Sequence, residues 1–245
     1  MKLTKDSAKI VNHVKRLTNN GDIPILNNNV VFTDIFQKMY NNYYLTENTK
    51  LVIDYEKKRP RQIMIPVVIR NKLNAYKHCY SFQLTVQNNT ICTVHMFFDK
   101  SMDQKDLASM TKKIIVAIKL ISAYSRSYTE RLDIEIIFTE FKKMLPSHAS
   151  PLDEQHINSA FVMNCTPRKI MTIFRREEWY KVLIHELLHA FNIDFSCKNQ
   201  TEIDIYMNSL FPIKKDNFRL FETYTELWAI MIHCCCISFY EAKDK

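Results

Sequence analysis

Apolar residues along this chain recur at two spacings, one typical of helices and the other of strands. Helical spacing, with an apolar side chain every three or four positions, predicts helices at residues 4–18, 34–44, 101–124, 176–192 and 217–240. Asn19-Asn20-Gly21 follows the first of these segments and is typical of a helix end. The pattern therefore predicts helices at both ends of the chain and further helices within it.

Alternating apolar and polar residues predict strands in the middle of the chain. Residues 82–86 and 91–98, with Asn88-Asn89 between them, are typical of a hairpin. Further extended segments are expected at residues 62–65, 67–69, 132–138 and 157–163, with Pro66 at an edge or a bulge. This order of elements favours an α+β fold with an N-terminal helical lobe at residues 1–60 and a main domain at residues 61–245.

Composition narrows the classes of function. The 245 residues include a single glycine, Gly21, which excludes the glycine-rich phosphate loop and the dinucleotide fingerprint, because both need backbone approaches that only glycine permits. The net charge of +8 is spread along the chain and predicts a solvated basic surface. A face that binds nucleic acid or an acidic partner is the alternative interpretation.

Seven cysteines form no CxxC pair, and the first residues lack the apolar core of a signal peptide. We therefore expect free, mostly buried thiols in a reducing compartment, and a cytoplasmic or other intracellular location. The longest apolar stretch, residues 227–240, is too short to cross a bilayer, so no membrane span is expected. Cys234-Cys235-Cys236 lies in this stretch, and adjacent helical residues point about 100° apart, so these thiols cannot share one ion.

The segment His185-Glu186-Leu187-Leu188-His189 carries the clearest chemical pattern. Residues four apart lie on one face of a helix, so both imidazoles can reach one zinc ion, while Glu186 lies beside that ion and can contact a water molecule. The flanking residues are apolar and predict a buried helix, in which unpartnered imidazoles and a carboxylate would cost roughly 1–3 kcal/mol each. Two core histidines with ordinary hydrogen bonds are the alternative.

A catalytic zinc site usually has three protein ligands. The metzincin spacing would place a histidine at position 195, where this chain has Phe195, so that class is excluded. Glu222 and Glu226 lie one turn apart on the last predicted helix, so one can bind the metal while the other accepts a hydrogen bond from a ligand histidine. A solvated acidic helix face is the alternative interpretation of this pair.

With these residues the chain resembles the gluzincin class of zinc metallopeptidases, in which HExxH is followed downstream by a glutamate on a second helix. The segment from Glu222 to Ala229 is similar to the ExxAxxFA form of small intracellular members. The resemblance implies a zincin-like fold, in which a small twisted sheet with an edge strand packs on the HExxH helix and a C-terminal ligand helix. It also implies Zn²⁺ as cofactor, Glu222 as third ligand, and Glu226 in place of the usual aspartate or asparagine.

The resemblance covers about residues 100–240 in the order of elements, and it extends to the strand before the motif. Asn158 and Ala160 are similar to the Asn-Ala pair of the gluzincin edge strand, which implies that they bind substrate backbone by strand addition. The Asn-, Lys- and Ile-rich, glycine-poor composition is also similar to metallopeptidases of large DNA viruses. For a viral protein, the virion is a further expected location.

The expected function is hydrolysis of peptide bonds in a peptide or protein substrate, with Glu186 as the general base. Tyr206 and Tyr224 are the candidates for stabilising the oxyanion, whereas His233 lies three helical turns beyond Glu222, too far to reach the same ion. Two alternatives remain open. The chain could be a binding or structural protein that keeps the zincin fold without turnover, or it could associate with nucleic acid.

Overall fold

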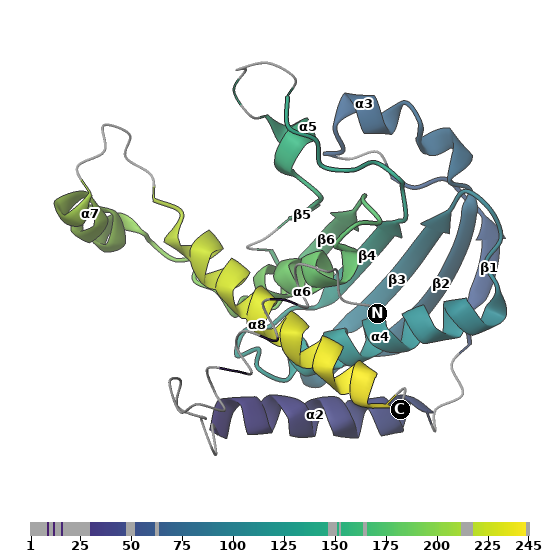
Figure 1. Ribbon diagram of the computed structural model, residues 1–245, viewed down its shortest axis with the longest axis horizontal. Coiled ribbons are helices and arrows are strands. Elements are labelled where there is room, and N and C mark those ends of the chain that lie inside the picture. The colour runs from purple at the N-terminus through teal and green to yellow at the C-terminus, as the bar shows by residue number, and fades with distance from the viewer. Residues whose placement is uncertain are drawn as a thin grey trace.

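A computed structural model describes residues 30–47, 52–61, 64–146, 151, 153–163, 166–211 and 218–243, together with Lys9, Asn12 and Arg16. The described strands form one mixed six-stranded sheet in the order β1-β2-β3-β4-β6-β5 (Figure 1). The strands are β1 (Asp54–Lys57), β2 (His78–Thr85), β3 (Ile91–Phe98), β4 (Arg131–Ile137), β5 (Ala160–Val162) and β6 (Arg168–Ile173). The class is therefore α+β, as the sequence predicts.

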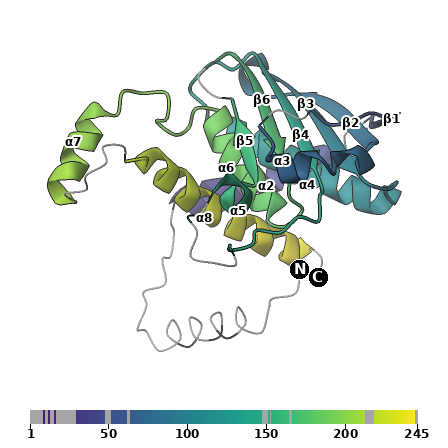
Figure 2. The same ribbon diagram turned by 90° about the horizontal axis from the view of Figure 1, so that it is seen from above.

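Helices lie on both faces of this sheet, and most of the long ones lie on the same face. The long ones are α2 (Val30–Glu47), α4 (Gln104–Ser122), α6 (Trp179–Ala190), α7 (Thr201–Leu210) and α8 (Leu220–Lys243). The short ones are α3 (Val67–Arg70), η1 (Leu73–Ala75), η2 (Gln87–Asn89) and α5 (Glu154–Ile157). Both views show α7 projecting away from the sheet, at one end of the molecule (Figures 1 and 2).

The sheet is built from a hairpin followed by parallel strands. β2 and β3 pair antiparallel around η2, where Asn88 and Asn89 adopt the left-handed conformation that asparagine tolerates. α4 then crosses over to β4, which lies parallel to β3, and β6 continues the parallel section. The edge strands β1 and β5 are antiparallel to their neighbours. Because β5 is the last strand in the order, one of its sides has no described partner strand, and β5 contacts α6.

Two apolar cores hold the layers together. The larger lies between the sheet and the helices α4, α6 and α8, and it includes Met96, Ile118, Ile134 and Leu183, all fully buried. The smaller lies on the opposite face under α3 and η1 and includes Phe97. Strand residues alternate between the two faces of the sheet. In β3, for example, Met96 belongs to the larger core and Phe97 to the smaller one.

The N-terminal segment packs on the rest of the molecule where it is described. α2 includes the residues of the predicted helix 34–44 and contacts α4 and α8. The Tyr124 hydroxyl, after α4, donates a hydrogen bond to Asp34 of α2 at 2.7 Å. β1 joins the sheet. The predicted helix 4–18 lies outside the described residues, apart from Lys9, Asn12 and Arg16, which are helical. The division at residue 60 stays a prediction.

Several expected elements differ from those found. Residues 67–69 form helix α3 and not a strand: Pro66 is its N-cap, and the carbonyl of Pro66 accepts hydrogen bonds from the N–H groups of Ile69 and Arg70, both at 2.9 Å. Only residues 160–162 of the predicted strand 157–163 are extended, since α5 ends at Ile157. Strand β6 and helix α7 were not predicted; the buried Lys169 in β6 conceals its apolar alternation. The extended segment expected at residues 62–65 is not found as a strand: residues 62 and 63 lie outside the described part of the chain, Met64 is in a turn with a φ of 53°, and Ile65 belongs to no strand. The predicted strands 82–86, 91–98 and 132–138 and the predicted helices 34–44, 101–124, 176–192 and 217–240 are found at similar positions.

The cysteines also differ from expectation at one position. Cys79, Cys92, Cys235 and Cys236 are free and buried, and Cys234 is free and exposed. Cys197 is disulfide-bonded, so the expectation of free thiols is wrong there. Cys165 lies outside the described residues. Among the residues that are described, none of the helices combines the length and the apolar character that a membrane crossing requires.

Candidate metal centre

The HExxH segment lies on α6, which is buried between the sheet and α8. On the sheet side of this helix, the core is filled by Leu183, Ile184 and Leu187, which are all fully buried. Residues 185 and 189 are one turn apart and face α8. Packing on both sides therefore fixes the helix rotation and aims the two imidazoles at the first turn of α8.

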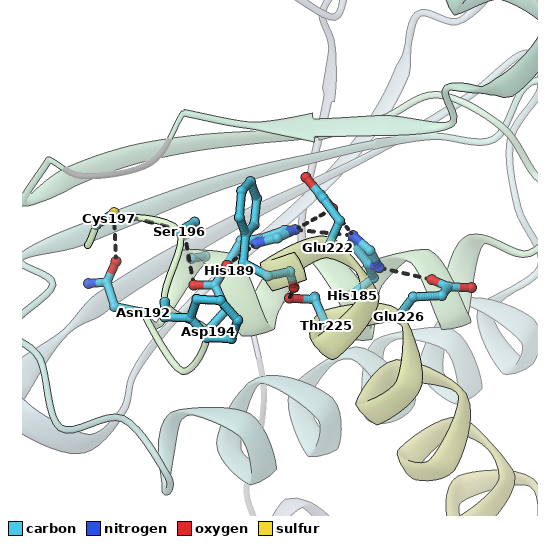
Figure 3. Close-up of polar contacts among 12 residues, drawn as sticks. His185, His189, Asn192, Asp194, Ser196, Cys197, Glu222, Thr225 and Glu226 are labelled. Atoms are coloured by element: carbon cyan, nitrogen blue, oxygen red, sulfur yellow. Dashed lines mark hydrogen bonds and ion pairs between the residues drawn. The ribbon is translucent and has the colours of Figure 1, made fainter. Parts of the chain in front are cut away.

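Three donor atoms from these two helices converge (Figure 3). His185 Nε2 lies 3.1 Å from His189 Nε2. Glu222 Oε2 lies 3.4 Å from His185 Nε2 and 3.3 Å from His189 Nε2. His185, His189 and Glu222 are called the helix site below.

These separations fit zinc. Bonds of about 2.0–2.1 Å in a tetrahedral arrangement place neighbouring ligand atoms about 3.3–3.4 Å apart. The three measured separations, 3.1, 3.3 and 3.4 Å, match that spacing without any movement of the side chains. Two imidazole nitrogens and one carboxylate oxygen are also a ligand set of hydrolytic zinc enzymes. The residues present therefore fit the metal that the sequence predicts.

Each of the two histidines is held by a further carboxylate. His185 Nδ1 contacts Glu226 Oε2 at 3.0 Å, and Lys181 donates to the other oxygen of Glu226 at 2.6 Å. His189 Nδ1 contacts Asp194 Oδ2 at 2.6 Å. A proton on each Nδ1, donated to the carboxylate, leaves each Nε2 lone pair for a metal. The structure thus brings Glu226 to the place that the sequence predicts for it.

Asp194 is a residue that the sequence analysis missed. It follows the end of α6, after a turn in which Asn192 has a φ of 52°, and its side chain is 1% exposed. Ser196 donates a hydrogen bond to its other oxygen at 3.0 Å. An acidic residue five positions after His189 was the available signal, but only the turn brings its carboxylate back to the imidazole.

The electrostatics of the site favour a bound cation. The contacts with His185 and His189 hold the pKa of Glu222 well below its usual range. Burial lowers the pKa of His189, but the carboxylates of Asp194 and Glu222 outweigh burial and raise it to about 10. Burial raises the pKa of Glu186. Carboxylates thus surround the imidazoles closely enough to favour a proton on His189, at the place where a metal ion would supply the positive charge.

A cleft of about 640 Å³ opens over the helix site and is lined by its three residues, by Glu186 and by β5. The carbonyl of Ser159 and the N–H of Met163 point to β6, where they pair with Phe174 and Ile170. Backbone groups alternate in direction along an antiparallel strand, so those of Ala160 and Val162 point to the other side. No further described strand pairs on that side of β5.

The remaining predicted site residues lie in different surroundings. Asn158 and Ala160 line the cleft, and the carbonyl of Asn158 accepts a hydrogen bond from the Arg175 guanidinium at 2.9 Å. Tyr206 is 64% exposed on α7. Tyr224 packs against Phe195, with ring centroids 5.6 Å apart. The described residues that line the cleft include neither tyrosine.

Basic residues occupy the cleft where the sequence analysis had expected a tyrosine. Lys143, Lys181 and Arg219 line it, and Arg219 stands just before α8. His233 packs against the ring of Tyr180, with centroids 5.9 Å apart, and is not among the described residues lining the cleft. Its predicted separation from the metal ligands is consistent with this position.

Comparison of the chain with protein-family models, with curated proteins and with solved structures finds no match.

Proposed function

We propose that this protein is a zinc-dependent metallopeptidase with a zincin-like fold, as its resemblance to the gluzincins implies. The observation that carries the proposal is the convergence of three donor atoms within 3.1–3.4 Å of one another beside a buried glutamate. A purely structural histidine pair would not require Glu222, Glu226 and Asp194 to be gathered around it. Held by His185, His189 and Glu222, a zinc ion would polarise a carbonyl group and lower the pKa of a water molecule.

Glu186 is suited to move the proton in such a reaction. It lines the cleft, is 8% exposed, and has a pKa that burial raises above the ordinary value of a glutamate, which makes it a better proton acceptor. It would take a proton from the attacking water molecule and deliver it to the leaving amine. Asp194 and Glu226 would keep the imidazoles oriented while this happens.

The substrate would lie along β5. The outward backbone groups of Ala160 and Val162 offer hydrogen bonds to an extended peptide, which would add to the sheet as a further strand. A peptide in this position lies in the cleft above the helix site. Arg219 and Lys143 are the cations lining the cleft that could stabilise negative charge on the scissile carbonyl group.

The test combines turnover with metal content. Zinc-loaded protein is incubated with a mixture of random-sequence peptides, and newly formed amino termini are counted by mass spectrometry. We expect cleavage by the wild type and a rate at least about 100-fold lower for Glu186→Gln, since general acid–base catalysis contributes that much or more. Glu186→Gln should retain the zinc content of the wild type, because Glu186 is not a ligand.

Glu202→Gln, on the exposed first turn of α7, is the matched control and should cleave at the wild-type rate. Loss of one zinc ion per chain in His189→Ala would support the ligand assignment. A wild type that holds zinc in the helix site but cleaves none of the peptides would overturn the peptidase proposal and favour a binding protein. A wild type that binds no zinc there would overturn the metal site as well.

A further inference from the structure

A second group of metal-ligating side chains lies on the face of the sheet opposite α6. Glu56 of β1 is directly opposite Cys79 of β2, and His95 of β3 lies diagonally from Cys79, two residues before its partner Phe97. Residues of this kind, with Cβ atoms on one face of adjacent strands, lie within reach of one another. The group therefore joins an edge strand to two inner strands.

The donor atoms of the three residues approach metal-binding distances. Cys79 Sγ lies 3.9 Å from His95 Nδ1, and one donor atom each from Glu56, Cys79 and His95 lie within 4.8 Å of one another. Zinc bonds of about 2.3 Å to sulfur and 2.0–2.1 Å to nitrogen place these two ligand atoms about 3.6 Å apart. The Cys–His pair is already close to that spacing, and the half-exposed Glu56 side chain can approach by rotation.

The cations beside the group are paired with carboxylates, one of which is Glu56 itself. Lys58 pairs with Glu56 at 3.2 Å. Arg61 lies 3.2 Å from Glu135 and 3.7 Å from Asp133. Arg61 is thus matched by carboxylates outside the group, whereas Lys58 is paired with Glu56 itself and has to leave that carboxylate when a metal ion binds. The thiol proton, released to solvent on binding, is replaced by the metal ion.

Other roles suit Cys79 less well. Its side chain is 0% exposed. A buried thiol of this kind is a poor nucleophile and a poor redox sensor, since both roles need an exposed thiolate. Cys79 packs in the smaller apolar core, and its position beside His95 also suits a soft divalent ion.

We propose that Glu56, Cys79 and His95 form a second metal site, the sheet site, which takes zinc or a similar thiophilic divalent ion. A solvent molecule would complete the four ligands. The site would fasten β1, a four-residue edge strand that is exposed along its whole length, to β2 and β3. It is independent of the proposed peptidase function and lies on a different face of the sheet.

Cobalt(II) distinguishes the two sites because only the sheet site contains sulfur. Cobalt bound by thiolate gives a near-ultraviolet charge-transfer band, which cobalt bound by imidazole and carboxylate lacks. We expect two cobalt ions per wild-type chain together with this band. Cys79→Ala should lose the band and one ion, whereas Glu222→Ala should lose one ion and keep the band.

Cys92→Ala is the matched control, because Cys92 is also a 0% exposed cysteine of the same sheet but belongs to the core on the helix face. It should keep both the band and the second ion. Where Cys79→Ala fails to fold, Glu56→Gln, at an exposed position, should still weaken binding at the sheet site by at least about tenfold. One cobalt ion per chain without the band would overturn the sheet site and leave the helix site standing. A band that persists in Cys79→Ala would overturn the assignment of the thiolate.

Discussion

The helix site and the sheet site use similar ligand types but differ in how far their geometry is fixed. In the helix site the donor atoms are 3.1–3.4 Å apart, and both histidines are held by further carboxylates. In the sheet site the donor atoms lie within 4.8 Å, and one ligand comes from an exposed edge strand. A site that is already assembled loses less conformational freedom when it binds a ligand, so it binds more tightly.

The difference follows from the elements that carry the ligands. His185 and His189 share one buried helix, whose turn fixes their spacing, and α8 packs directly against that helix. The ligands of the sheet site come from three strands, so their spacing depends on register and on side-chain rotation. We therefore expect the helix site to bind zinc more tightly than the sheet site.

Removal of a direct ligand should have the largest effect. Glu222→Gln keeps the shape of the side chain but removes the carboxylate charge, so zinc affinity at the helix site should fall by more than the 10–100-fold that loss of an outer partner costs. Titration against a chromogenic chelator measures this affinity. The sheet site should be unaffected. An unchanged affinity at the helix site would show that Glu222 is not a ligand.

The two outer carboxylates should matter unequally. Asp194 is 1% exposed and holds His189 at 2.6 Å, whereas Glu226 is 42% exposed and is shared with Lys181. Asp194→Asn should therefore lower zinc affinity about 10–100-fold, and Glu226→Gln by about tenfold or less. The same chelator titration compares them. Equal losses would mean that exposure does not weaken the hold of Glu226 on His185.

More residues of the helix site than of the sheet site could be predicted from the sequence. Helical periodicity fixes which residues share a face, so spacing grouped His185 with His189 and, separately, Glu222 with Glu226. The resemblance to the gluzincins joined these two pairs. Asp194 was missed because its position depends on a turn after α6. That turn has no glycine and is formed by Asn192 at positive φ.

The sheet site could not be found in this way. Glu56, Cys79 and His95 are far apart in the sequence, and only strand pairing and register bring them together. The fold shows the same limit. The β2–β3 hairpin was predicted from local alternation, whereas β6 was missed because the charged Lys169 occupies a position that faces the core.

The buried Lys169 holds the end of α6, and burying its charge costs free energy of folding. Its ammonium group donates to the carbonyl of Ala190 at 2.6 Å and to the side chain of Asn192 at 2.8 Å, and so closes the C-terminal end of α6. Burial lowers its pKa from the ordinary 10.5 to about 8. Between those values the unfolded chain keeps a proton that the native state has released. Over that window this group makes the free energy of unfolding rise with pH.

The last prediction, on stability and not on metal affinity, is the loss of this pH dependence in Lys169→Met. In the presence of chelator, the stability of the wild type relative to this variant should increase by about 1 kcal/mol per pH unit above about pH 8. Denaturant unfolding at several pH values measures the difference. Arg168→Met, at the exposed neighbouring position, should keep the wild-type pH dependence. A difference between wild type and Lys169→Met that is constant with pH would mean that Lys169 keeps its proton in the native state, and that the end of α6 is solvated enough to hold the charge without cost.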